Sequence, residues 1–126
     1  SYPAGRPEVP ARYREVGQPV LVPGDMGRYS YVLVGTQTAM TESFGSTCHG
    51  AGRRMSRSAA KRALKGVDLQ RQLQDQGIFV RAQSRELLAE EAPEAYKDVE
   101  DVAKACEGAG LSRRVARLRP VAVIKG

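Results

Sequence analysis

The sequence predicts an α+β fold. Short apolar runs rich in β-branched residues, which are typical of strands, lie near both ends of the chain, and segments with helical spacing lie between them. The two kinds of segment are intermixed without the strand–helix–strand rhythm of a doubly wound parallel sheet. With 126 residues, 41% of them hydrophobic and 27% charged, the chain has the size and composition of one soluble globular unit.

Two strands are predicted after a proline-rich lead-in. Residues 1–19 contain four prolines and show little periodicity, so they are expected to be extended. The apolar runs 20–22 and 31–34 are predicted to form two buried strands, joined by the glycine-containing loop 23–27. This loop lacks the Gly-Lys-Ser/Thr ending of a Walker-type loop, so by itself it is a weak indication of phosphate binding.

The most basic segment, residues 53–65, is predicted to be a helix. Met55, Ala59 and Ala63 recur at every fourth position as its apolar face, and Gly66 acts as a stop signal. Basic side chains fall in a stripe about 120° wide on the opposite side of this helix. They are Arg53, Arg57, Lys61 and Lys65.

Shorter elements are predicted in the second half of the chain. Residues 68–76 favour a second short helix, and residues 78–80 favour a strand. Ser84 is expected to cap the start of another helix, because a serine side chain can accept a hydrogen bond from a backbone N–H in the first turn. The apolar run 121–124 is predicted to be the final strand.

The clearest amphipathic helix is predicted after Asp98, which is expected to cap it. Its apolar positions follow helical spacing, and Gly108 and Gly110 provide the end of the helix. These apolar positions are Val99, Val102, Ala103 and Cys106.

The net charge of +6 is concentrated in one part of the chain. Between Glu42 and Asp68 there are six basic residues and no acidic residue, whereas the other basic residues are balanced by the 14 acidic ones. Such a local excess is expected of a site for a polyanion rather than of a generally basic surface. The six are Arg53, Arg54, Arg57, Lys61, Arg62 and Lys65.

Composition argues against several classes of protein. No apolar run approaches the roughly 18 residues needed to cross a bilayer, so no membrane is expected as a partner. Cys48 and Cys106 are too few for a disulfide framework, which favours a reducing, cytoplasmic setting. One histidine, two distant cysteines and scattered carboxylates match no metal-ligand spacing, so no metal ligand is predicted, and Cys48 is expected to be a small buried side chain.

His49, the only histidine, is the candidate catalytic residue. It precedes the run Gly50-Ala51-Gly52-Arg53 at the start of the predicted basic helix. Glycines let a backbone approach an anion closely, and the start of a helix adds a partial positive charge. A neutral imidazole can attack an activated phosphorus, and nearby arginines would stabilise charge on the phosphoryl oxygens. The pattern therefore indicates a nucleophile held against a phosphate.

Simpler interpretations of the same residues stay open. A lone histidine is more often a surface or structural residue than a catalytic one. The glycines are also compatible with a tight turn, and the basic stripe with a solvated helix face.

Several stretches form a longer pattern that covers almost the whole chain. They are QPVLVPGDMG at 18–27, SYVL at 30–33, FGSTCHGAGR at 44–53, MSR at 55–57, EAPEAYK at 91–97 and RPVAVIKG at 119–126. Together they resemble the C-terminal part of the RtcB family of RNA-splicing ligases. The resemblance implies that residues 1–126 are the C-terminal portion of one RtcB-type catalytic domain rather than a self-contained domain.

The resemblance also implies an activity. RtcB ligases depend on GTP and manganese, and they join an RNA 2′,3′-cyclic phosphate or 3′-phosphate end to a 5′-hydroxyl end in tRNA splicing and RNA repair. In such enzymes a histidine attacks the α-phosphate of GTP, and the GMP passes to the RNA 3′-phosphate before the 5′-hydroxyl displaces it. We therefore expect the same chemistry here.

Site residues are implied position by position. His49 matches the guanylylated histidine, and Arg53 and Arg57 would grip RNA phosphate. The GMP phosphate would be lined by Gly50, Ala51 and Gly52. The nucleotide would be contacted by Pro23, Gly24, Asp25, Met26 and Ser30, with Tyr96 stacked near guanine and Lys125 hydrogen bonded to the guanine edge.

The family pattern extends beyond this chain. Family members are several times longer, and their manganese ligands lie almost entirely upstream of the matching region, so Ser1 is expected to fall inside the ordinary fold. Manganese would be bound mainly by residues outside this chain, and the chain alone is expected to be poorly stable or inactive. The expected partners are the upstream part of the ligase, RNA in the form of tRNA halves or broken RNA, and an activating protein such as archease.

Two other functions stay open. A non-catalytic RNA-binding fragment would use the basic helix 53–65 to contact phosphates, with His49 only structural. The sparse aromatic residues, which show no paired RNA-recognition pattern, weigh against it. A structural partner subunit would bind neither GTP nor RNA.

Overall fold

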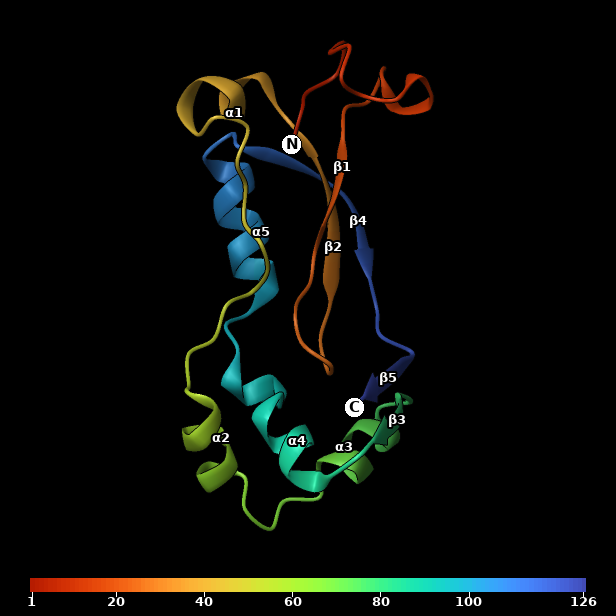
Figure 1. Ribbon diagram of the computed structural model, residues 1–126, viewed down its shortest axis with the longest axis vertical. Coiled ribbons are helices and arrows are strands. Elements are labelled where there is room, and N and C mark those ends of the chain that lie inside the picture. The colour runs from red at the N-terminus through yellow and green to blue at the C-terminus, as the bar shows by residue number, and fades with distance from the viewer.

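The computed structural model describes residues 1–126 and confirms the α+β fold class. Two regions follow each other along the long axis (Figure 1). The first contains strands β1 (Pro19–Val22), β2 (Ser30–Gly35) and β4 (Ser112–Leu118), with helices α1 (Gln37–Glu42) and α5 (Val99–Gly108). The second contains helices α2 (Arg57–Ala63), α3 (Leu69–Asp75) and α4 (Arg85–Glu90), with strands β3 (Phe79–Ala82) and β5 (Ala122–Lys125). The 3-10 turns η1 (Ala11–Tyr13) and η2 (Pro93–Ala95) complete the fold.

The first region is built on an antiparallel sheet with strand order β1-β2-β4. The two strands predicted at 20–22 and 31–34 are confirmed as β1 and β2, in a register that pairs Val20 with Leu33. The prediction that both are buried is right for β2 and wrong for β1, where Leu21 is 73% exposed. The reason is topological, because β1 is an edge strand and alternate side chains of a strand point to opposite faces.

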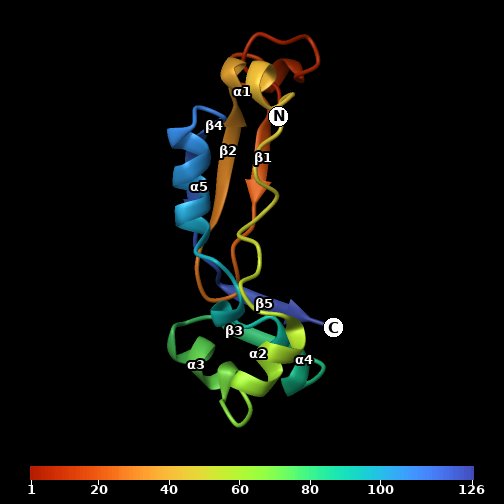
Figure 2. The same ribbon diagram turned by 90° about the vertical axis from the view of Figure 1, so that its left-hand side faces the viewer.

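Helix α5 and the connection between α1 and α2 lie on the same face of this sheet (Figure 2). The connection brings Ala51 and the half-buried Cys48 against α5, where Val99 and Ala103 are fully buried. This cluster also takes in Leu33 of β2. The apolar face predicted for this helix is therefore confirmed, and burial of that face is what holds the segment around His49 in place.

The Asp98 cap is confirmed. Its carboxylate accepts a hydrogen bond from the N–H of Glu100 at 2.8 Å. Glu100 and Asp101 in the first turn add negative charge where the helix dipole is positive. The helix ends at Gly108, and Gly110 adopts a φ of +71°, a conformation that favours glycine.

The second region has its own core, which packs α3 and α4 against β3. The predicted Ser84 cap is confirmed, since its side chain accepts from the N–H of Leu87 at 3.1 Å. The predicted helix 68–76 forms as α3, and Asp68 caps it by accepting from the N–H of Arg71 at 3.1 Å. Strand β3 pairs with β5 in parallel, with Phe79 opposite Ala122, so the predicted strands 78–80 and 121–124 meet in one ladder.

The predicted basic helix 53–65 is shorter than expected. Helix α2 begins only at Arg57, because Ser56 caps it through the N–H of Ala59 at 3.1 Å. Upstream, the N–H groups of Arg54 and Met55 instead donate to the carbonyl of Ala95 at 2.9 and 3.3 Å. His49 is consequently not adjacent to a helix start.

The buried face of α2 also differs from the predicted one. Ala60 is fully buried and Leu64 packs against the second core, whereas the predicted Ala63 is exposed. Packing against α4 accounts for the difference, because residues four apart share a helix face and it is the face of Ala60 that is buried.

Strand β4 and helix α1 were not predicted. Strand β4 carries several arginines and little apolar alternation, so its sequence has no clear strand pattern. It is held by antiparallel pairing with the distant strand β2 and by a contact with the end of α5, where the backbone N–H and Nε of Arg114 donate to the Glu107 carboxylate at 3.0 and 2.7 Å. Helix α1 has only six residues and is capped by Thr36.

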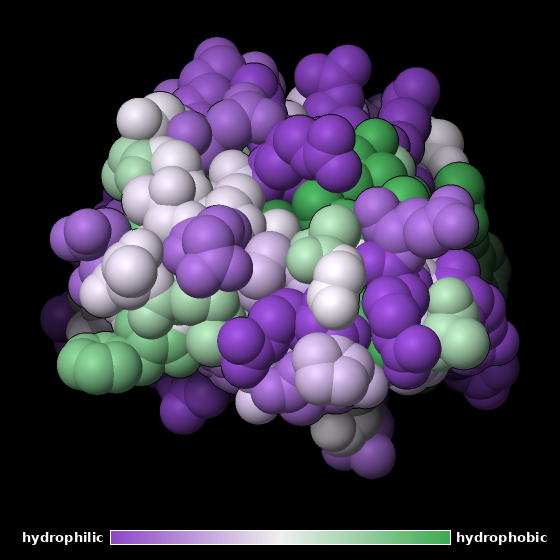
Figure 3. Space-filling model, turned by 90° about the horizontal axis from the view of Figure 1, so that it is seen from above, coloured by the Kyte–Doolittle hydropathy of each residue, from purple (hydrophilic) through white to green (hydrophobic).

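Several large apolar side chains are exposed. They include Leu21, Phe79, Val115, Val121 and Ile124, with exposed fractions from 59% to 77%. The surface at the end of the molecule that carries the N-terminal segment and α1 is mixed in hydropathy, with hydrophilic side chains around smaller apolar areas (Figure 3). None of the helices has the length and apolar character to cross a membrane.

The loop between β1 and β2 depends on a glycine. A Cβ atom at Gly24 would lie 2.0 Å from the carbonyl oxygen of Tyr29 and 2.8 Å from Cγ1 of Val99. We expect Gly24→Ala to lower the free energy of unfolding by about 2 kcal/mol or more, because the backbone would have to shift to relieve the clash. Urea denaturation followed by circular dichroism measures this.

Gly108→Ala is the matched control. Nothing lies within 4 Å of a Cβ at this helical position, so the substitution is expected to be neutral or to stabilise by up to about 1 kcal/mol. Equal unfolding free energies for the two variants would contradict the close approach at Gly24.

Candidate functional site

An open pocket of about 360 Å³ lies where the two regions meet. Its walls come from the loop after β1, the start of β2, the segment after α4, and β5 with the residues before it. The lining residues are Pro23, Gly24, Asp25, Met26, Ser30, Glu91, Tyr96, Pro120, Ala122, Val123, Ile124 and Lys125. The structure thus brings together every predicted nucleotide contact outside the segment 50–52, from three parts of the sequence.

His49 lies in the segment next to this pocket. The residue is exposed, so its imidazole is open to reaction. The N–H of Ala51 donates to the carbonyl of Pro23 at 2.9 Å, which fixes the segment against one pocket wall. A Cβ at Gly50 would lie 3.1 Å from the same oxygen, so this close approach favours glycine.

The predicted phosphate loop itself does not line the pocket. Ala51 is buried in the core beside α5, whereas Gly52 is exposed with a φ of +74°, and its carbonyl accepts from the N–H of Lys97 at 2.9 Å. The segment 50–52 is therefore held on both sides, by the loop after β1 and by the segment after η2.

Asp25 has a structural role in this pocket wall. Its side chain is fully buried, and Oδ1 accepts hydrogen bonds from the N–H groups of Gly27 and Arg28 at 3.0 Å each. Oδ2 accepts from Nε of Arg28 at 2.6 Å. Because both carboxylate oxygens are already bonded within the protein, only the backbone of Asp25 is available to a ligand.

Arg28 connects that wall to the other side of the pocket. Its guanidinium donates to the carbonyls of Pro93 and Tyr96 at 2.8 and 3.1 Å. The hydrogen bonds that link Asp25 to Arg28, and Arg28 to Tyr96, set the distance between two pocket walls that are far apart in sequence.

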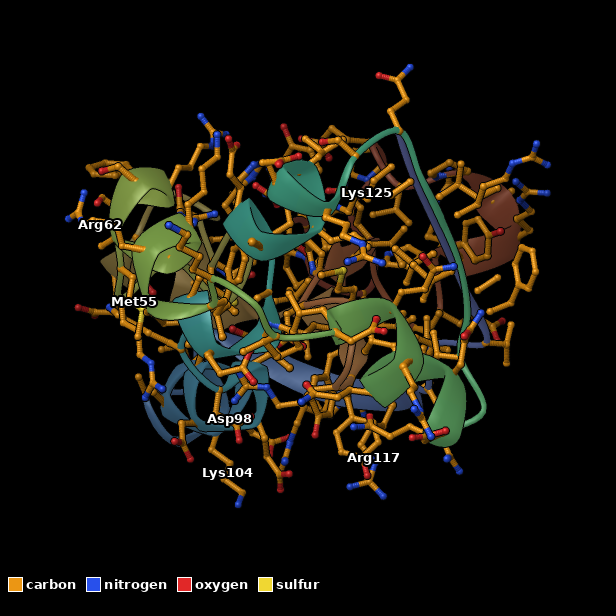
Figure 4. The ribbon with its side chains drawn as sticks, turned by 90° about the horizontal axis from the view of Figure 1, so that it is seen from below. Met55, Arg62, Asp98, Lys104, Arg117 and Lys125 are labelled. Carbon is orange, nitrogen blue, oxygen red and sulfur yellow. The ribbon has the colours of Figure 1, made fainter.

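Glu91 is the site residue that sequence analysis missed. It lies inside the stretch 91–97 that carried the family resemblance, but a single glutamate has no spacing that marks it. In the structure its carboxylate accepts from the Tyr96 hydroxyl at 2.5 Å and from the Arg53 guanidinium at 3.2 Å. The Lys125 ammonium lies 3.8 Å away, and Lys125 is seen beside α4 in Figure 4.

This setting alters the acidity of two groups. Burial acts to raise the pKa of Glu91, but the Tyr96 hydroxyl and the charges of Lys125, Arg53 and Arg57 outweigh it and hold this pKa below its ordinary value. Burial, followed by the hydrogen bond to Glu91 and its charge, raises the pKa of Tyr96. At neutral pH the pair is therefore a carboxylate and a protonated phenol that donates to it.

Arg53 occupies the centre of the site rather than a helix face. Its guanidinium donates to the carbonyls of Met55 at 3.0 Å and Glu90 at 2.5 Å, and to the Tyr96 hydroxyl at 2.9 Å. It also stacks over the Tyr96 ring, 4.8 Å from the centroid.

The predicted basic stripe is partly neutralised. Arg57 lies 3.8 Å from both Glu90 and Glu91, and Lys61 forms an ion pair with Glu90. The Arg57 side chain is nevertheless 70% exposed, so it can turn toward a phosphate. Arg62 points away from the protein on the outer side of α2 (Figure 4).

Cys48, next to His49, lies half-buried beside the Cys106 thiol. Burial, and then the neighbouring Cys106 thiol, raise the pKa of Cys48. The thiolate is the nucleophilic form of cysteine, so a raised pKa favours the less nucleophilic thiol form of Cys48 at neutral pH.

The residues present do not form a metal site. No three His, Cys, Asp or Glu side chains lie close enough together to hold a metal ion.

The lowered pKa of Glu91 predicts a dependence of stability on pH. Its ionised form is favoured in the folded protein, so its contribution is fully present above the ordinary value of 4.5 and is lost as the pH falls through the lowered value. Glu91→Gln should therefore flatten the decrease in unfolding free energy between about pH 5 and pH 3. Urea denaturation at several pH values measures the effect, with the exposed Glu86 in the first turn of α4, as Glu86→Gln, for control.

The chain is similar to members of one protein family along its whole length. The family model described as tRNA-splicing ligase RtcB matches residues 1–126. The chain is 61% identical over 122 residues to the tRNA-splicing ligase RtcB of Archaeoglobus fulgidus, an alignment that covers 97% of this chain and 25% of that protein.

Two further tRNA-splicing ligases RtcB are similar to the full chain. The protein of Thermococcus kodakarensis is 54% identical over 126 residues, which are 26% of its length. That of Pyrococcus horikoshii is 54% identical over 126 residues, which are 14% of its length. The chain thus spans about a quarter or less of these relatives. The resemblance predicted from the sequence is confirmed, and the chain belongs to the RtcB family of tRNA-splicing ligases.

Proposed function

We propose that this chain is the nucleotide-binding and nucleotidyl-accepting part of a GTP-dependent RNA ligase that acts in tRNA splicing and RNA repair. The enzyme joins an RNA 2′,3′-cyclic phosphate or 3′-phosphate end to a 5′-hydroxyl end. One observation carries the proposal: the exposed His49 segment is hydrogen bonded to the wall of a pocket lined by Tyr96 and Lys125, which lie 47 and 76 residues farther along the chain.

His49 is the nucleophile in this mechanism. An imidazole nitrogen attacks the α-phosphorus of GTP, so that an N–P bond forms while the bond to the pyrophosphate oxygen breaks. An oxygen of the RNA 3′-phosphate then displaces the imidazole, and the RNA 5′-hydroxyl finally displaces GMP to form the new phosphodiester bond. The exposure of His49 leaves it open to both the nucleotide and the RNA end.

The pocket supplies recognition of the base. The aromatic ring of Tyr96 offers a surface for stacking, and the Lys125 ammonium can donate to an acceptor on the guanine edge. The backbone of the loop 23–26 and the hydroxyl of Ser30 form the opposite wall. The exposed Arg57 and the central Arg53 would bind RNA phosphate.

Manganese is not assigned to any residue of this chain. The residues present do not fit a metal site, so no step is assigned to a metal here. We propose that manganese is held mainly by residues outside this chain, in the longer part of the relatives that it does not cover.

Further proposals follow from the division of the active site between this chain and the part that holds manganese. The chain alone is expected to lack ligase activity, and its partners are the upstream part of the ligase, tRNA halves or broken RNA, and an activating protein such as archease. A cytoplasmic location is proposed because two cysteines, both of them free thiols, fit a reducing setting. A non-catalytic RNA-binding fragment is the alternative, favoured by the exposed basic side chains of α2.

The nucleophile is tested by intact mass. The chain is incubated with GTP and manganese, with and without the upstream part of the Archaeoglobus fulgidus relative supplied separately. We expect a mass increase of one GMP in the mixture that contains the upstream part, because that part provides the metal ligands. His49→Ala should abolish the increase, and Lys125→Ala should reduce it at low GTP concentration because guanine recognition is weakened.

A mixture without any adduct would contradict the ligase proposal and leave RNA binding as the better account. Robust adduct formation by the chain alone would contradict the proposed division of the metal site.

The phosphate contact of Arg57 is tested by the salt dependence of RNA binding. Loss of one phosphate contact lowers the slope of log affinity against log salt concentration by about 0.7 to 1. We expect Arg57→Ala to show this change. Arg12→Ala, in η1 at the opposite end of the molecule, should leave the slope unchanged (Figure 1). Fluorescence anisotropy with labelled single-stranded RNA measures both, and equal slopes would exclude Arg57 from the RNA site.

A further inference from the structure

Glu91 borders the proposed nucleotide pocket, yet the mechanism above gives it no role. Its side chain is 20% exposed, and the residues on its C-terminal side, Ala92 and Ala95, are fully buried. A backbone anchored in this way holds the carboxylate at a fixed place on the pocket rim.

The two carboxylate oxygens face different parts of the site. Oε2 accepts from the Tyr96 hydroxyl at 2.5 Å and lies 3.8 Å from the Lys125 ammonium, both of which line the pocket. Oε1 accepts from Arg53 at 3.2 Å and lies 3.8 Å from Arg57, both on the proposed phosphate-binding side. One carboxylate thus connects the residues assigned to the base with those assigned to RNA.

We propose that Glu91 is a positioning residue for nucleotide binding, which orients Tyr96 and Lys125 toward the guanine base. The proposal rests on the proposed function and names a residue through which its pocket is organised. A lysine side chain has several freely rotating bonds, so without a fixed counter-charge its ammonium would sample many positions. The hydrogen bond from Tyr96 similarly fixes the plane of the ring, because the hydroxyl has one strong acceptor in a defined direction.

A direct contact between Glu91 and the ligand is less well supported. Its oxygens already accept two hydrogen bonds and are surrounded by three positive charges, so the carboxylate is satisfied before any nucleotide arrives. A group that is satisfied within the protein is suited to holding its neighbours in place.

The test uses the full 126-residue chain together with the upstream part of the Archaeoglobus fulgidus relative. Formation of the GMP adduct on His49 is measured as a function of GTP concentration, which separates KM from kcat. We expect Glu91→Gln to raise KM about tenfold, because the charge that holds Lys125 is lost, and to change kcat by less than about threefold. Glu91→Asp should recover part of the loss, and Glu86→Gln should behave like the wild type.

A double-mutant cycle with Tyr96→Phe tests whether the effect passes through the hydroxyl. If Glu91 positions Tyr96, the effects of the two substitutions on the free energy derived from KM are not additive. The fold increase in KM of the double variant is then smaller than the product of the two single fold increases. Additive effects would overturn the part of the proposal that concerns Tyr96.

Four results would overturn the proposal, and they are distinguishable. If Glu91→Gln has the KM of the wild type and forms a normal adduct on His49, the positioning role of Glu91 is refuted and the proposed function is unaffected. A loss confined to kcat would place Glu91 in the chemical step. Loss of the circular dichroism signal in both Glu91→Gln and Glu91→Asp would mean that Glu91 only maintains the fold. Absence of an adduct in the wild-type mixture would instead refute the proposed function, and this inference with it.

Discussion

The guanidinium of Arg53 joins three segments of the chain that meet at the pocket. It donates to the carbonyl of Met55 within its own segment, to the carbonyl of Glu90 at the end of α4, and to the hydroxyl of Tyr96 after η2. A planar fork of donors can satisfy several acceptors at once, which an ammonium group cannot do in a fixed plane. The position of the His49 segment relative to Tyr96 follows from this side chain, so the geometry of the site depends on it.

The second constraint is that acidic residues at the C-terminal end of α4 offset the positive charge of the basic segment. The run between Glu42 and Asp68 has no acid in sequence, but folding brings Glu90 and Glu91 against Arg53, Arg57 and Lys61. The positive potential at this surface is therefore smaller than the sequence suggests. An incoming phosphate must compete with carboxylates for Arg57, and such competition favours ligands that bring several charges at once.

Much of the fold could be predicted because local signals were strong. The capped starts at Ser84 and Asp98 were predicted correctly, since a cap and the first turn lie within a few residues of each other. The start of α2 was wrong because Arg54 and Met55 give their N–H groups to Ala95, about 40 residues away. Strand β4 was missed for a similar reason, since pairing with the distant strand β2 compensates for a weak strand pattern.

By itself the sequence determined the α+β class, the family, the candidate nucleophile His49 and most of the residues that line the pocket, because these depend on short motifs and local periodicity. Only the tertiary structure decided that Asp25 is turned inward, that Arg53 lies at the centre of the site, and that Glu91 connects it to Tyr96 and Lys125. The physical reason is that a charge acquires its role from its neighbours in space. Those neighbours come from distant parts of the chain, and no local pattern records which of them will meet.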